Sequence, residues 1–137
     1  MRRRGEVNIA IADYLDNNFI PDRADINITS YDLRHIIISR WYYGVYLIAK
    51  NYLINNLICT DDKNNFHHKT NEDAHIYSIW HRIANVRNGI FHSDLIQGEK
   101  LAKLREDYEY TGNLCSDTDF NNARRIFNEI YEILNTF

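Results

Sequence analysis

The hydrophobic residues of this chain fall into stretches in which they recur every three or four positions, the period of amphipathic α-helices. The pattern predicts helices at about residues 7–18, 31–58, 71–87, 98–110 and 119–134. Polar connections separate them, and the three arginines at residues 2–4 are interpreted as a solvated arm. Polar residues that can cap the predicted helices are Thr29 or Ser30, Thr70 with Asp73, and Ser116 or Asp117.

The segment 31–58 is apolar on nearly every side of the helix that it predicts. A helix of that kind has to be covered all round, so it is either the central element of the fold or lies partly in an oligomer interface. Arg40 falls within this segment. A buried guanidinium needs a partner or a ligand, and Glu72, Asp73 or a phosphate could provide it.

Turn-forming residues are scarce, with one proline and five glycines in 137 residues. This scarcity favours long helices over a many-stranded sheet. Hydrophobic residues make up 45% of the chain, and ten tyrosines, six phenylalanines and two tryptophans distinguish it from a disordered sequence. We therefore expect an all-α fold, an antiparallel bundle of four to five helices that forms one domain over residues 1–137.

The net charge of −3 argues against a protein that coats nucleic acid through a broad basic face, so any such contact should be local. Cys59 and Cys115 form no CxxC pattern, which favours free thiols in a reducing compartment. The most apolar run, 36–49, contains Arg40 and is too short to span a membrane. With no export signal visible, we expect a cytoplasmic protein without membrane contact.

The segment 87–92 combines a permanent cation, a helix-breaking pair and an imidazole. Arg87 can pair two phosphate oxygens at once, and His92 can take or give a proton near neutral pH. In one continuous helix these two side chains would point about 140° apart. They can share a site only if Asn88 and Gly89 interrupt the helix, or if a second chain completes the site.

Three segments of the chain carry recognisable motifs. They are Ser39-Arg40-Trp41-Tyr42-Tyr43, Arg87-Asn88 through His92, and Leu104-Arg105-Glu106-Asp107-Tyr108. In this order they resemble the S-R-A-Y-Y, R-N-x-x-x-H and L-R-x-x-A-D-Y segments of the HEPN family. The resemblance extends over about residues 31–136 and includes the pattern of the last helix.

The resemblance implies a helical bundle that dimerises with its two motifs facing each other across a cleft. Many HEPN domains are metal-independent endoribonucleases that act as toxins or as effectors of antiviral defence. The implied partners are a second copy of the chain, an RNA substrate and an antitoxin or defence-system protein. In the branch silenced by modification of a tyrosine two residues after the histidine, that tyrosine corresponds to Asp94 here, so this mode of silencing is not expected.

The chemistry of RNA cleavage gives a separate reason to expect a dimer. Attack by the 2′-hydroxyl needs a general base, a general acid and a cation at the phosphorus, whereas one chain offers one motif histidine. An isologous dimer would bring two copies of His92 and of Arg87 to one site, and Asn88 could hold a phosphate oxygen or orient His92. No cofactor and no metal is required for this reaction. We take Arg40, Tyr43 and Asp94 as candidate substrate-binding residues.

Other interpretations remain open at this level. Arg87 could cap a helix through its carbonyls, with His92 an ordinary half-buried residue. The domain could also be a non-catalytic HEPN module that binds nucleotide or RNA, or dimerises within a larger complex. The acidic pI and Asp94 favour that module, whereas the retained Arg87 and His92 favour the enzyme. A plain helical interaction protein would follow if the resemblance were accidental.

The remaining clusters have simpler interpretations. Aromatic residues in an apolar helix are more often core than base-stacking groups, and this applies to Tyr42, Tyr43 and Tyr46. The spacing of the histidines does not favour a metal site and indicates solvated loop residues instead; these are His67, His68, His75 and His81. Solvated faces are the simplest interpretation of the basic residues Lys100, Lys103, Arg105, Arg124 and Arg125, with RNA docking the less favoured one.

Overall fold

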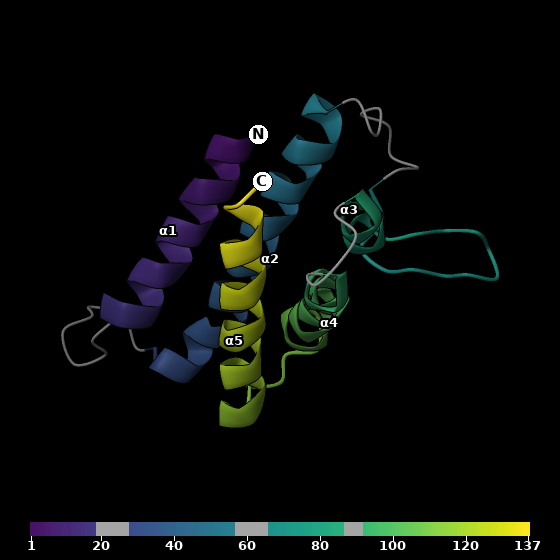
Figure 1. The fold of residues 1–137 in the computed structure, drawn as a ribbon. Coiled ribbons are helices and arrows are strands. Elements are labelled where there is room, and N and C mark those ends of the chain that lie inside the picture. Colours follow the sequence, from purple (N-terminus) through teal and green to yellow (C-terminus); the bar gives the residue numbers. More distant parts are fainter. Residues whose placement is uncertain (19–27, 57–65, 87–91) are drawn as a thin grey trace.

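The computed structural model describes residues 1–18, 28–56, 66–86 and 92–137. These residues form an all-α fold, as predicted, with helices α1 (Arg2–Asn18), α2 (Ser30–Asn55), α3 (Ile79–Val86), α4 (His92–Glu109) and α5 (Asp117–Leu134) (Figure 1). Within the described ranges the only β pairing consists of isolated bridges, His67 with Ser78 and Asn71 with Ile76.

Helix α2 is the central element, because it contacts each of the other four helices (Figure 1). Its buried residues are Leu33, Ile37, Ile38, Trp41, Tyr42, Gly44, Val45, Ile48, Ala49 and Leu53. The all-round apolar pattern is therefore explained to a large extent by cover within one chain. Tyr31, Ile36 and Tyr43 remain exposed on it.

Helices α1 and α2 approach each other closely at two glycines. A Cβ atom on Gly5 would lie 2.6 Å from the carbonyl oxygen of Gly44, and one on Gly44 would lie 2.4 Å from Cγ1 of Ile9. The predicted solvated arm at residues 2–4 is wrong, since α1 already begins at Arg2. Arginine is a good helix former, and Arg2 pairs with Glu6 one turn later at 3.2 Å.

The predicted helix 71–87 is wrong over its first half. The structure has α3 only from Ile79, and the Ser78 hydroxyl, not Thr70, accepts the backbone N–H of His81 at 3.1 Å as a cap would. The Thr70 hydroxyl instead donates to Glu99 of α4 at 2.7 Å and accepts the backbone N–H of Ser78 at 3.0 Å. These side-chain bonds hold residues 66–78 in a non-helical loop.

Helix α4 begins at His92, earlier than the predicted residue 98, and Gly98 lies inside it. The flat face of Trp80 in α3 packs directly against this glycine, where a Cβ atom would come within 2.1 Å of the indole. A glycine that looked like a helix boundary is thus a point of close helix packing.

The caps of α2 and α5 agree with the prediction. Thr29 and Asp32 form a complete capping box at α2, and the Ser116 hydroxyl accepts the backbone N–H of Asp119 at 3.2 Å. Helix α2 ends at Asn55, slightly before the predicted residue 58.

The connection from α4 to α5 is tied to α2 by Arg34. This side chain donates to the carbonyl of Cys115 at 3.0 Å and pairs with Asp117 at 2.8 Å. Cys115 is a free thiol that is 3% exposed, and burial raises its pKa to about 11. Among the described residues, none of the helices has the length and apolar character needed to cross a membrane.

Candidate functional site

The Arg-to-His motif falls between two helices. Helix α3 ends at Val86 and α4 begins at His92, so the chain that joins them contains Arg87 and Asn88. Arg87, Asn88 and the proposed break at Asn88-Gly89 lie outside the described residues. His92 is the first residue of α4, and Asp94 is half-buried in its first turn, where a carboxylate interacts favourably with the helix dipole.

Arg40 and Tyr43 lie on the outer side of α2, next to α1. The expectation of a buried Arg40 is wrong, because its side chain is exposed and donates to Asn8 of α1 at 2.9 Å. Tyr43 is 38% exposed. Both line an open pocket of about 520 Å³, together with Asn8, His35, Ile36, Ser39 and Glu109.

Among the described residues, Arg105 of α4 is a buried cation that is only 9% exposed. Its guanidinium lies over two aromatic rings of α2, with Cζ at 5.2 Å from the centroid of Tyr42 and at 4.7 Å from that of Tyr43. The predicted solvated position of Arg105 is therefore wrong. Cation–π attraction and the buried aliphatic stem stabilise an arginine in such a place.

The hydrogen-bonding capacity of Arg105 is poorly used. Its Nη2 donates to the Tyr110 hydroxyl at a long 3.4 Å, and its Nε lies 3.3 Å from Glu109 without good hydrogen-bond geometry. Its Nη1 is buried and has no hydrogen-bond partner among the described residues. Although burial disfavours the charge, Tyr43 and Glu109 favour it more strongly, so the pKa of Arg105 is raised.

Tyr42 and His68 form a neutral pair beside this guanidinium. The Tyr42 side chain is fully buried, and its hydroxyl is hydrogen-bonded to Nδ1 of His68. Burial raises the pKa of Tyr42, whereas burial and the nearby Arg105 lower the pKa of His68. Both groups are thus uncharged at neutral pH, and the prediction of a solvated loop histidine is wrong for His68.

A pocket of about 490 Å³ opens beside Arg105, between α4 and the loop 66–78. Its lining residues are His67, His68, Lys69, Asn71, Ile76, Ala102, Arg105, Glu106 and Tyr110. Lys69 and Glu106 form an ion pair, and both side chains are about half exposed. The described residues contain no group of three potential metal ligands.

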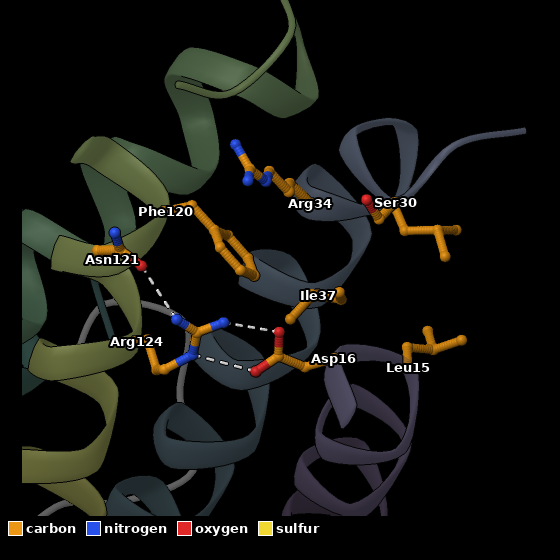
Figure 2. Close-up of a pocket in the computed structure, with 9 residues that line it drawn as sticks. Leu15, Asp16, Ser30, Arg34, Ile37, Phe120, Asn121 and Arg124 are labelled. Atoms are coloured by element: carbon orange, nitrogen blue, oxygen red, sulfur yellow. Dashed lines mark hydrogen bonds and ion pairs between the residues drawn. The ribbon is translucent and has the colours of Figure 1, made fainter. Parts of the chain in front are cut away.

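A smaller pocket of about 240 Å³ between α1, α2 and α5 differs in that its cations are paired. Figure 2 shows Arg124 and Asp16 pointing toward each other, with hydrogen bonds of 3.0 and 2.7 Å, and Asn121 as a further partner of Arg124. Arg124 was predicted on a solvated face and instead joins α5 to α1. Arg34, which also lines this pocket, is held by Cys115 and Asp117, so no free donor fork is offered here.

Sequence reasoning missed the cluster around Arg105, although a signal for it exists. The buried positions of α4 are Leu95, Gly98, Leu101, Ala102 and Arg105. Their spacing of three and four residues places the arginine on the same face as the apolar residues. Comparisons with family models, curated proteins and solved structures find no match to this chain.

Proposed function

We propose that this protein is a metal-independent endoribonuclease of the HEPN type, which acts as a homodimer in a toxin or antiviral-defence system. The observation that carries this proposal is the position of the motif between the last residue of α3, Val86, and the first residue of α4, His92. A helix running through both Arg87 and His92 would separate their side chains by about 140°. In the structure α3 and α4 are two separate helices.

The packing of α3 on α4 anchors the two helices that flank the motif. Trp80 contacts Gly98, and this contact lies about 9 Å along each helix from Val86 and from His92. The two helix ends that flank residues 87–91 are therefore anchored by one tight contact. Such anchoring is what a site needs if its groups are to be held in a reactive arrangement.

In the proposed reaction the 2′-hydroxyl of the RNA attacks the adjacent phosphorus and the bond to the 5′-oxygen breaks. One His92 takes the proton of the attacking hydroxyl, and His92 of the second protomer gives a proton to the leaving oxygen. Arg87 stabilises the charge on the phosphoryl oxygens, and Asn88 orients a phosphate oxygen or the imidazole. The products are a 2′,3′-cyclic phosphate and a 5′-hydroxyl.

Incubation of labelled RNAs with the purified protein in EDTA tests this proposal. We expect cleavage with cyclic phosphate ends, a loss of at least about 10²-fold in rate for His92→Ala, and poor activity for Arg87→Lys, which keeps the charge but not the bidentate fork. His75→Ala, at an exposed position, is the matched control and should cleave like the wild type. Cleavage that is lost in EDTA and restored by a divalent ion would refute the proposal.

A mixed dimer of one wild-type chain and one His92→Ala chain tests whether the site is composite. If both imidazoles are needed, its activity should be close to that of the doubly substituted dimer. Two independent sites would instead give about half of the wild-type activity.

The alternative of a non-catalytic binding module is favoured by a different observation. Arg105, a buried cation with unused donors, lines a pocket toward the opposite end of α4 from His92. A protein that binds a ligand there and cleaves no RNA would match this alternative.

A further inference from the structure

We propose that the pocket beside Arg105 binds a small ligand through a phosphate-type oxyanion, with the Arg105 guanidinium as its principal donor and Lys69 as a second cation at the rim. This site is separate from the motif at residues 87–92 and does not depend on the ribonuclease proposal.

The first argument is that the buried guanidinium of Arg105 is incompletely hydrogen-bonded. Burying a charge is costly unless it is paired and hydrogen-bonded. The rings of Tyr42 and Tyr43 fix the guanidinium in place, yet aromatic faces accept none of its in-plane N–H groups. Nε and Nη1 are shielded from solvent and have no hydrogen-bond partner among the described residues, although Nε lies 3.3 Å from Glu109. Nη2 donates to the hydroxyl of Tyr110, which is itself 69% exposed.

The second argument is geometric. Nε and Nη1 of Arg105 are shielded from solvent, so an anion in the pocket would contact the guanidinium through Nη2. The present partner of Nη2, an exposed tyrosine hydroxyl at a long 3.4 Å, is one that a phosphate oxygen can replace. The pocket volume of about 490 Å³ lies within the range of small-molecule sites. The Lys69 ammonium has three N–H groups, so it can bind an anion while it keeps its pair with Glu106.

The third argument concerns the size of the ligand. Glu106 lines the pocket and Glu109 lies beside the guanidinium, so carboxylates flank the cation on its own helix. Both carboxylates would repel a polyanionic strand that runs across this surface. A single phosphoryl group on Arg105 is attracted by the guanidinium and has few further negative charges near the carboxylates.

The distance from the motif also favours a separate ligand. Arg105 follows His92 by thirteen residues in one helix, which corresponds to about 20 Å along the axis and about 140° around it. One phosphate cannot contact both residues. We therefore assign the Arg105 pocket to a second molecule.

Calorimetric titration with inorganic phosphate at constant ionic strength tests the proposal. We expect saturable binding of one phosphate per chain at this pocket, weakened by at least about tenfold in Arg105→Gln, because a charge-assisted hydrogen bond is lost, and by a smaller factor in Arg105→Lys, which keeps the charge. Lys69→Gln should weaken binding by a smaller factor, about threefold, since this cation is half exposed. Arg125→Gln, an exposed arginine paired within α5, is the control and should bind like the wild type.

Several outcomes would overturn the proposal. One is the absence of saturable binding, and another is binding that is unchanged in all three variants of the site. A third is displacement of inorganic phosphate from Arg105 by a single-stranded RNA that has no terminal phosphate. If the Arg105 variants fail to fold, Lys69→Gln decides the question because its side chain lies at the surface.

Discussion

The burial of Arg105 changes the ionisation of the residues around it. Its guanidinium lies among Tyr42, Tyr43 and His68, with Glu109 as the nearest carboxylate. Burial and, after it, the fixed positive charge of Arg105 lower the pKa of His68, so its imidazole is neutral when it hydrogen-bonds to Tyr42. The charge of Arg105 thus adds to the effect of burial on its neighbour.

This arrangement predicts a pH dependence of stability that belongs to His68. Its pKa is lower in the folded protein than the ordinary 6.5, owing to burial, Arg105 and His67, with Lys69 adding to the effect and Glu106 opposing it. As the pH falls, the unfolded state binds the proton first, so the free energy of unfolding decreases below about pH 6.5 and levels off below the folded pKa. Urea unfolding at several pH values should show a shallower decrease for His68→Gln, which keeps a partner for Tyr42.

His75→Asn provides the matched control for this measurement. His75 is exposed and has a positive φ of 55°, a conformation that asparagine tolerates. This variant should retain the wild-type dependence on pH. An unchanged slope in His68→Gln would contradict the assignment.

Arg40 and Arg105 show why the sequence predicted the fold better than the site. Both arginines lie in helices with many apolar residues, and the pattern alone suggested that Arg40 was buried. Arg40 in fact shares a surface stripe with the exposed Ile36 and Tyr43, at helical spacing. In α2, which is apolar on most sides, periodicity has no contrast from which to assign a face, so Arg40 was placed wrongly. Arg105 lies on the apolar stripe of α4, and its charge alone suggested a solvated face.

At the scale of the elements, α3 and α4 are joined by the contact between Trp80 and Gly98. In an isolated helix, alanine is favoured over glycine by about 1 kcal/mol. We predict the opposite sign here: Gly98→Ala should lower the free energy of unfolding by about 2 kcal/mol or more, because its Cβ would overlap the rigid indole. Chemical denaturation measures this, with Lys100→Ala at an exposed position of α4 as the control, which should change stability by less than about 0.5 kcal/mol.

The bonds of Thr70 give a second prediction at this scale. Thr70→Val keeps the shape of the side chain but removes its hydrogen bonds to Glu99 and to the backbone of Ser78. The free energy of unfolding should fall by about 1–3 kcal/mol, because these polar groups lose their partner in a part-buried place. Thr118→Val, an exposed threonine of α5, should have little effect in the same denaturation experiment, and equal effects would contradict the role of Thr70.

The helix caps and the loop 66–78 show how far the helix boundaries can be predicted from the sequence. Caps such as Thr29 and Ser116 act within three residues, so the sequence could predict them. The loop 66–78 depends on Glu99, which is distant in sequence and comes close only in the folded chain. A local pattern contains no information on such a partner, and the helix predicted from residue 71 was therefore too long.

For the whole molecule, four helices of the same chain cover α2. Its apolar pattern is therefore no longer an argument for a dimer, and the dimer has to be tested directly. The composite site needs two chains, since each chain contributes one His92. Sedimentation at about 50 µM should show a homodimer, because an interface with a Kd of about 1 µM would be nearly saturated there. A strictly monomeric protein at this concentration would refute both the dimer and the composite site.

The buried Cys115 is a natural labelling probe for local opening of the bundle. A thiol that is 3% exposed, with a pKa of about 11, reacts with an alkylating reagent only after the α4–α5 connection has opened. In a Cys59→Ser background the labelling rate therefore reports the frequency of that opening. Arg34→Gln, which removes the pair with Asp117 that ties the connection to α2, should accelerate labelling well before the chain unfolds globally.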